Sequence, residues 1–266
     1  MSTISTTLLL AVAVQAARRA STHAASHAAR RHDANAIAHN DVKLKLDEEC
    51  QGVAIRTILD AFPDHAILAE EDTEELAALK AHSSEYQWII DPIDGTVNFF
   101  HGNPYWCCSV AVRRDGETLA GCIAAPDEGL LFEATCDGPA LCNGLPIHVA
   151  DTTAIDEAEV LTGADKSEDP AQRPFRFFNA IADIVQRPRI GGSAALDLCN
   201  VARGAFDAYF EPGIFTWDIA AGDLILRRAG GTGTVMRRFG GHKLAYLGAC
   251  TPALRDILAN ALEPHF

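Results

Sequence analysis

The sequence predicts an α/β protein in which layers of sheet and helix are stacked. Three observations support this. Short apolar runs typical of strands alternate with longer runs of helical periodicity. No repeat or low-complexity linker interrupts the chain. Its 266 residues, 48% of them hydrophobic, can bury an extensive core, as one large domain or as two closely joined ones.

The first elements are expected to be two helices and a strand. Residues 7–31 have the pattern of a long amphipathic helix. The apolar run 8–17 within it predicts neither a signal peptide nor a membrane span: no basic residue precedes it, arginines follow it, and a span needs about 20 residues. Residues 50–61 predict a second helix, and a Phe-Pro-Asp turn at 62–64 joins it to a strand over 66–68.

The later elements alternate in type. A turn at Asp115-Gly116 joins the first two of three predicted strands, and Gly230-Gly231 ends a helix that starts near Trp217. We expect strands over residues 109–113, 118–125, 129–135 and 205–210, and helices over 175–185 and 194–201.

The most informative stretch is WIIDPIDGTVNFFHGNPYW, residues 88–106. Its apolar start predicts a buried strand, and Pro92 prevents regular continuation because proline lacks a backbone donor. Asp91, Asp94 and Thr96 share the turn that follows. Gly95 lets the backbone approach a ligand there.

Two carboxylates in one turn would repel each other and a phosphate, unless a divalent cation lay between them. The turn therefore predicts a site for metal and phosphate together, with Thr96 and Asn98 at the start of a short helix whose amides point outward. The alternative is a plain acidic turn, because Asp, Pro and Gly are ordinary turn residues.

Two further acidic positions extend the pattern. Asp218, in WDIAAGDLILRRAGG, stands at the entry to a predicted helix, where it could also be a simple N-cap. The cluster Glu70-Glu71-Asp72 follows a predicted strand, and such clusters are also common in solvated loops.

These segments resemble the inositol monophosphatase family, within the lithium-sensitive, magnesium-dependent phosphatases that include fructose bisphosphatases and nucleotide 3′-phosphatases. The resemblance rests on AEED at 69–72, DPIDGTVNF at 91–99, GGSAALDLCNVARGAFDAYFEPG at 191–213 and WDIAAG at 217–222. These motifs stand in the family's order and cover most of the chain from about residue 41 to 231. The resemblance implies a layered α-β-α-β-α sandwich of the sugar phosphatase type.

The resemblance also implies one unit over 1–266, with a loose boundary near Ala150. The N-terminal half, 1–150, would hold most metal ligands, and the C-terminal half, 151–266, would supply Asp218 and the substrate contacts. Two or three Mg²⁺ ions are implied as cofactors. The metal ligands would be Glu70, Asp91, the Ile93 carbonyl, Asp94 and Asp218, with Asp91 shared by two ions.

Roles for phosphate binding and water activation follow from the same resemblance. Asp94 and the amides of Gly95 and Thr96 would hold the phosphate. The Thr96 hydroxyl, with Asp47 or Glu71 as its acceptor, would orient and deprotonate the attacking water.

Substrate choice is expected to depend on Glu211, which matches a family position that binds a ring hydroxyl, and on Gly192, Ser193 and Ala194, which match the family's ring-contacting turn. A carboxylate accepts two vicinal hydroxyl hydrogen bonds, as a polyol offers. Alternatively, Glu211 simply precedes a Pro212-Gly213 turn.

The predicted activity is hydrolysis of inositol monophosphate or a related polyol or sugar phosphate. Bisphosphate substrates would need additional Lys or Arg side chains near the pocket. Lys166, Arg187 and Arg189 lie in the C-terminal half, which is expected to supply the substrate contacts. Fructose-1,6-bisphosphatase, 3′-nucleotide phosphatase and histidinol-phosphate phosphatase activities therefore stay open. A non-catalytic regulatory protein that keeps the fold is the alternative from a different class.

Composition limits the partners. A net charge of −14 disfavours nucleic acid and anionic membrane and leaves a small phosphate ester as the expected partner. Divalent cations would reverse the sign of the local field for this anion. The eight cysteines form no CxxC pair and are expected to be reduced, in the cytoplasm. The resemblance implies a homodimer.

Three features depart from these patterns. In DVKLKLD, residues 41–47, Lys43 and Lys45 replace residues of the family's DLVT-type run. They either face solvent on alternate strand positions, or Lys43 reaches the rim of the site and offsets its carboxylates. Arg227-Arg228 stands where relatives usually have a Glu, and we expect it at the surface. His23, His27 and His32 share a helix face but lack the companions of a metal site.

Overall fold

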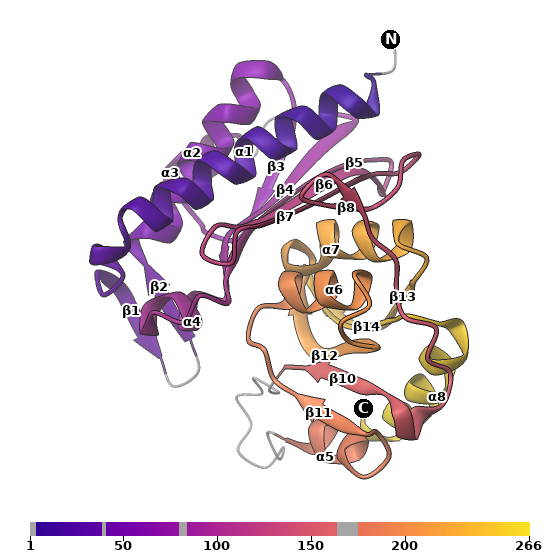
Figure 1. Ribbon diagram of the computed structural model, residues 1–266. Coiled ribbons are helices and arrows are strands. Elements are labelled where there is room, and N and C mark those ends of the chain that lie inside the picture. Colours follow the sequence, from indigo (N-terminus) through magenta and orange to yellow (C-terminus); the bar gives the residue numbers. More distant parts are fainter. Residues whose placement is uncertain (1–3, 39–40, 80–83, 164–174) are drawn as a thin grey trace.

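The computed structural model describes residues 4–38, 41–79, 84–163 and 175–266, and its layers follow the order α-β-α-β-α (Figure 1). The helices α1 to α8 are Thr6–Ser26, Lys45–Ala61, Glu74–Leu79, Thr96–His101, Arg176–Ala182, Ala194–Ala202, Thr216–Arg228 and Pro252–Leu262. The strands β1 to β14 are Ala34–Ala38, Asp41–Leu44, Ala66–Ala69, Tyr86–Asp94, Cys107–Arg114, Glu117–Ala125, Leu130–Thr135, Leu141–Cys142, Leu145–Pro146, Glu159–Thr162, Arg187–Arg189, Ala208–Phe215, Thr232–Gly240 and Lys243–Ala249.

The first sheet has seven strands in the order β3-β4-β5-β6-β7-β8-β9. β3 runs parallel to β4, and every later pair is antiparallel. Helices α1 and α2 cover its outer face, as Figure 1 shows. Their apolar side chains form one core with alternate residues of the strands, among them Trp88 and Val110. The predicted α-helical N-terminus and the strands on either side of Asp115-Gly116 are confirmed.

The second sheet has five strands in the order β11-β10-β12-β14-β13. Helices α6 and α7 lie between the two sheets and share a core with the inner face of each. Helices α5 and α8 cover the outer face of the second sheet, where a third core includes Phe177 and Phe210. The chain passes from one sheet to the other between β9 and β10, near the predicted boundary at Ala150. The division into two halves stays a prediction.

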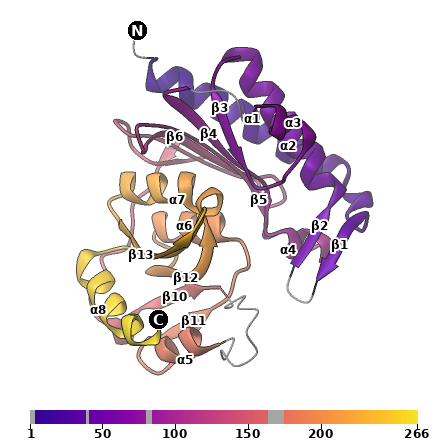
Figure 2. The ribbon, with the colours of Figure 1, turned by 180° about the vertical axis from the view of Figure 1, so that it is seen from behind.

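The β1-β2 hairpin and α4 lie together at one end of the first sheet, as the reverse view in Figure 2 shows. This packing holds Lys43, on β2, near the end of β4. None of the helices in the described residues is long and apolar enough to cross a bilayer.

Two local expectations were wrong. Helix α2 begins at Lys45, five residues before the predicted start, so Lys45 is a helix residue. The Pro212-Gly213 pair does not end a strand: β12 continues to Phe215, and the pair forms a bulge where the register with β14 shifts. After Gly231, where no element was predicted, the chain forms β13, β14 and α8.

Candidate active site

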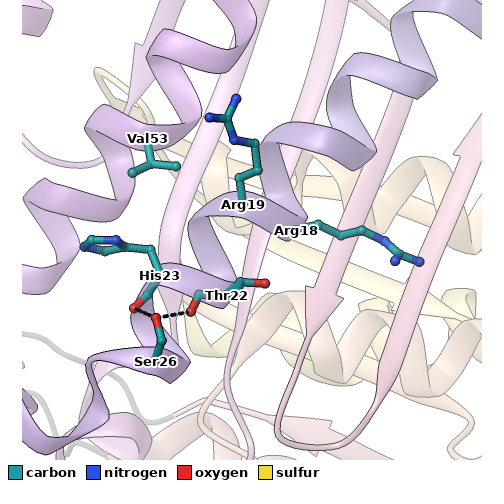
Figure 3. A pocket seen from close by; sticks show the side chains of 6 residues that line it. All are labelled: Arg18, Arg19, Thr22, His23, Ser26 and Val53. Atoms are coloured by element: carbon teal, nitrogen blue, oxygen red, sulfur yellow. Dashed lines mark hydrogen bonds between the residues drawn. The ribbon is translucent and has the colours of Figure 1, made fainter.

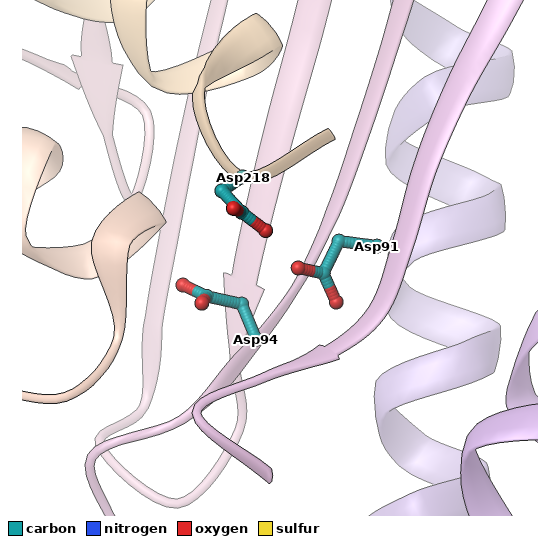
Figure 4. A group of neighbouring side chains, drawn as sticks. All are labelled: Asp91, Asp94 and Asp218. Atoms are coloured by element: carbon teal, nitrogen blue, oxygen red, sulfur yellow. The ribbon is translucent and has the colours of Figure 1, made fainter. Parts of the chain in front are cut away.

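Asp91 and Asp94 lie at the end of β4, where the strand leaves its regular pairing. β4 pairs with β5 in one register from Tyr86 to Asp91, and the register shifts before Asp94. Pro92 stands between them and has no amide to donate, which explains the bulge. Because of the bulge, both carboxylates point toward Asp218 (Figure 4).

Asp218 comes from the other side of the site, in the first turn of α7 (Figure 4). Its Oδ2 accepts a hydrogen bond of 2.7 Å from the Phe215 amide, which fixes the start of the helix. Asp91, Asp94 and Asp218 each offer a carboxylate oxygen, and these three atoms lie within 4.8 Å of one another. Residues more than 120 positions apart in the sequence therefore form one acidic cluster.

Asp94 is held from the start of α6. The Ser193 hydroxyl donates to Asp94 Oδ2 at 2.6 Å, the Ala195 amide donates to the same oxygen at 2.7 Å, and the Ala194 amide donates to Oδ1 at 3.3 Å. These bonds join the strand of the first sheet to the middle helix layer. Ser193 and Ala194, expected to contact a substrate ring, orient a carboxylate in this structure. Their substrate contact stays a prediction.

Glu70 and Glu71 follow β3, next to β4. The Glu70 amide donates to the Ile90 carbonyl at 3.3 Å. Glu71 is held by the side chain of Gln51 on α2: Gln51 Oε1 accepts from the Glu71 amide at 2.9 Å, and its Nε2 donates to the Glu71 carbonyl at 2.7 Å. Lys43 Nζ lies 3.1 Å from Glu71 Oε2. This contact places Lys43 beside a predicted site carboxylate, while 51% of its side chain is exposed, and its role in the site stays a prediction.

The carboxylates of the cluster resist ionisation. Burial, followed by the charges of Glu70 and Asp94, holds the pKa of Asp91 well above its usual range. Burial also raises the pKa of Asp218 well above its usual range, and Asp94 adds to this effect. The pKa of Glu70 is raised from 4.5 to about 7 by burial and by Glu71. Burial raises the pKa of Asp94 as well, against its donors from α6.

This donor set fits a divalent cation. It consists of carboxylate oxygens, the ligands that Mg²⁺ prefers. The Oδ1 atom of Asp91 is buried and has no hydrogen-bond partner among the described residues. A cation shared by these oxygens would remove both the repulsion and the unsatisfied acceptor.

Asp47 and Thr96 lie beside the cluster. Asp47, in the first turn of α2, accepts from the Leu44 amide through Oδ2 at 2.9 Å, and its buried Oδ1 has no partner among the described residues. The Thr96 hydroxyl donates to the Ile93 carbonyl at 2.8 Å. The expected bond from Thr96 to Asp47 or Glu71 therefore stays a prediction.

Gly95 lies where the backbone after β4 packs closely against the segments that contain Tyr105 and Gly192. Its φ of +91° is strained for other residues, and a Cβ here would lie 3.0 Å from the Tyr105 carbonyl oxygen and 3.2 Å from that of Gly192. Asn98 bridges the same two segments, since its Nδ2 donates to the Tyr105 carbonyl at 2.8 Å and to the Gly191 carbonyl at 3.0 Å.

Glu211 lies on β12 near the acidic cluster, and its charge contributes to the raised pKa of Asp218. The Tyr209 hydroxyl donates to Glu211 Oε2 at 2.6 Å. Of the cations proposed for bisphosphate binding, Arg189 pairs with Glu159 at 2.9 Å, and Lys166 lies outside the described residues.

A separate hollow of about 460 Å³ lies beside α1 and α2 (Figure 3). His23 Nε2 contacts Glu49 at 3.0 Å there, so it is part of an ion-pair group rather than of the acidic cluster. The hollow contains none of the predicted site residues. It is lined by Arg18, Arg19, Thr22, His23, Ser26 and Val53.

Sequence reasoning missed Gln51 and Tyr105, and it gave Asn98 and Ser193 roles other than the bonds they make in the structure. Gln51, Asn98 and Ser193 fix backbone segments or carboxylates through side-chain bonds. Tyr105 donates to the buried Asp197 at 2.6 Å and accepts from Asn200 at 2.7 Å. Gln51 stands beside Cys50 and Ala54 in the predicted helix over 50–61, and a polar residue among such apolar positions would have been the signal to follow.

Fold and site define a protein of the layered α/β type with an acidic cluster whose oxygens could hold a metal ion. The chain matches the inositol monophosphatase family over residues 6–264 and belongs to it. It is 37% identical to the Nus factor SuhB of Pasteurella multocida, over 96% of each chain. It is 35% identical to the chloroplastic phosphatase IMPL1 of Arabidopsis thaliana, over 84% of this chain and 62% of that protein.

Solved structures confirm the predicted fold. The inositol monophosphatase of Anabaena (Nostoc) sp. PCC 7120 is 30% identical, with a TM-score of 0.83 over 97% of this chain and 96% of that one. The extragenic suppressor protein suhB of Bartonella henselae is 28% identical, with a TM-score of 0.85 over 96% and 98%.

Proposed function

We propose that this protein is a Mg²⁺-dependent phosphomonoesterase that hydrolyses inositol monophosphate or a related polyol or sugar phosphate. The observation that carries the proposal is the convergence of Asp91, Asp94 and Asp218, whose oxygens lie within 4.8 Å of one another. Burying three acids together is costly unless cations neutralise them. Family membership supports the same activity.

The assigned ligands are Glu70, Asp91 and the Ile93 carbonyl for one ion, and Asp91, Asp94 and Asp218 for another. Bound divalent cations would lower the pKa of an attacking water and neutralise charge on the phosphate oxygens. Asp91 is suited to the shared position because it is 1% exposed and its Oδ1 has no other partner among the described residues.

The chain's own groups would place the phosphate and the water. The amides of Gly95 and Thr96, beside Asp94, bind the phosphate in this proposal. The Thr96 hydroxyl orients the water after turning from the Ile93 carbonyl, and Asp47 or Glu71 accepts the proton. The pKa of Asp47 is raised by burial, which brings this carboxyl closer to the range of a general base.

Glu211 would accept hydrogen bonds from the hydroxyls of a polyol substrate, with the turn of Gly192, Ser193 and Ala194 beside it. Specificity constants should be compared for inositol 1-phosphate, fructose 1,6-bisphosphate, 3′-phosphoadenosine 5′-phosphate, histidinol phosphate and NADP. Inositol 1-phosphate is expected to have the highest value. A higher value for a bisphosphate or a nucleotide would replace the polyol assignment.

A regulatory role is a second candidate, because several relatives, that of Pasteurella multocida among them, are named Nus factors. A regulator need not keep all the carboxylates of a metal site, whereas this chain has Glu70, Asp91, Asp94 and Asp218. Absence of phosphate release from every ester tested, in a folded protein that binds Mg²⁺, would favour the regulatory role.

Four further properties belong to the proposal. We propose inhibition by lithium and a homodimeric state, both on family grounds. We propose a cytoplasmic location, which six buried free cysteines support. A net charge of −14 supports a small phosphate ester, rather than nucleic acid or anionic membrane, as the partner.

A further inference from the structure

Lys43 brings a positive charge to the acidic site. It lies on β2 between the buried residues Val42 and Leu44, and 51% of its side chain is exposed. Its ammonium nonetheless lies 3.1 Å from Glu71 Oε2, and only 9% of the Glu71 side chain is exposed. A lysine that pairs with a buried carboxylate beside a cation site differs from a lysine in open solvent.

The pair is fixed from the carboxylate side. Gln51 is fully buried and binds both the amide and the carbonyl of Glu71. The hairpin that carries Lys43 contacts α4, the helix that follows Gly95. The strand that carries Lys43 therefore packs beside the segment that follows Gly95, while its ammonium pairs with Glu71. Its charge acts on both Glu70 and Asp47, lowering the pKa of each against the larger effect of burial.

A count of formal charges in the proposed site suggests what the Lys43 ammonium does. Two divalent cations would leave six ionised carboxylates with two negative charges in excess, before a phosphate dianion enters. The six are Asp47, Glu70, Glu71, Asp91, Asp94 and Asp218. A fixed cation beside Glu71 makes it harder for a further divalent ion to bind there and easier for an anion to approach.

We propose that Lys43 is a permanent cation of the site, which weakens the binding of divalent cations near Glu71 and strengthens the binding of phosphate. The inference rests on the proposed function, because it assumes a site that binds Mg²⁺ and phosphate. It differs from a purely structural role in predicting opposite effects on the two ligands.

The test uses Lys43→Met, with Lys43→Arg as the variant that keeps the charge. Lys45→Met is the matched control, because Lys45 lies two positions away, is exposed, and has no ion-pair partner among the described residues. Calorimetry would measure the binding of Mg²⁺ to the metal-free protein, and then of inorganic phosphate to the Mg²⁺-saturated protein. Thermal unfolding in EDTA would confirm that each variant is folded.

Lys43→Met is expected to bind Mg²⁺ roughly 3- to 10-fold more tightly, or to bind additional Mg²⁺, and to bind phosphate roughly 3- to 10-fold more weakly. These differences should shrink in about 1 M NaCl. Lys43→Arg and Lys45→Met should stay within about twofold of the wild type. Unchanged binding of both ligands, or weaker binding of Mg²⁺, in folded Lys43→Met would overturn the inference.

The outcome can be separated from that of the proposed function. If no ester is hydrolysed but Lys43→Met shows opposite changes in the binding of Mg²⁺ and phosphate, the phosphatase proposal fails and the role of Lys43 holds. If esters are hydrolysed and Lys43→Met binds both ligands as the wild type does, only the role of Lys43 fails.

Discussion

Replacing Asp91 by Asn is expected to destroy activity and, in the absence of metal, to stabilise the fold. Asp91 is 1% exposed, and its negative charge is opposed by Glu70, Asp94 and Asp218. Asn has the same shape without the charge. Burial and these neighbouring charges hold the pKa of Asp91 well above its usual range, so its ionised form costs folding free energy. An unsatisfied buried polar group costs roughly 1 to 3 kcal/mol, and removing such a cost from a chain of this size corresponds to a rise in Tm of roughly 2 to 12 °C.

The assay is thermal unfolding at pH 8 in EDTA and again in excess Mg²⁺. In EDTA, Asp91→Asn should melt above the wild type. Mg²⁺ should raise the Tm of the wild type and have little effect on the variant, because a shared ligand is lost. Asp60→Asn, at an exposed position on α2, is the control and should change stability by less than about 0.5 kcal/mol. A variant that melts below the wild type in EDTA, or keeps near-normal activity, would refute this reasoning.

The remaining predictions concern pH, substrate and inhibitor. In EDTA, folded Glu70 holds a proton between pH 4.5 and about 7 that the unfolded chain releases, so stability should fall by about 3 kcal/mol as pH rises through this range; denaturant titrations at several pH values should show the fall, and a rise would count against the buried cluster. Glu211→Ala should lower kcat/KM for inositol 1-phosphate roughly 10- to 100-fold and leave a small aryl phosphate nearly unchanged; equal losses on both would make Glu211 structural or metal-linked. Asp218→Asn should instead lower kcat/KM for both substrates together, and a selective loss would remove it from the metal site. Lithium should inhibit by taking a Mg²⁺ position with half the charge, and indifference to lithium would withdraw only the claim of sensitivity.

The sequence was informative where the chemistry is local. Around Asp91 and Asp94, Pro92 and Gly95 indicate where the strand ends and the short helix begins. Helix α7 begins near Asp218, as the WDIAAG motif predicts. The contacts between layers could not be predicted in this way. Ser193 binds Asp94 across about a hundred residues, and neither segment alone shows which donor meets which acceptor.

Some elements were hidden by competing local signals. Pro and Gly at 212–213 indicate a turn, yet β12 accommodates them as a bulge because the flanking residues pair with β14. Lys43 and Lys45 alternate with apolar residues as in a strand, yet Lys45 belongs to α2. The reason is that Asp47 caps this helix by accepting a hydrogen bond from the Leu44 amide. In both places, tertiary pairing or capping outweighed the pattern of the sequence.

The most direct test of the central claim is phosphate release from inositol 1-phosphate by one sample of pure protein, followed in Mg²⁺, then in excess EDTA, then after Mg²⁺ is restored. We predict steady release in Mg²⁺, loss of release in EDTA, and recovery with the added ion. Release that continues unchanged in EDTA would contradict a phosphatase built on Asp91, Asp94 and Asp218.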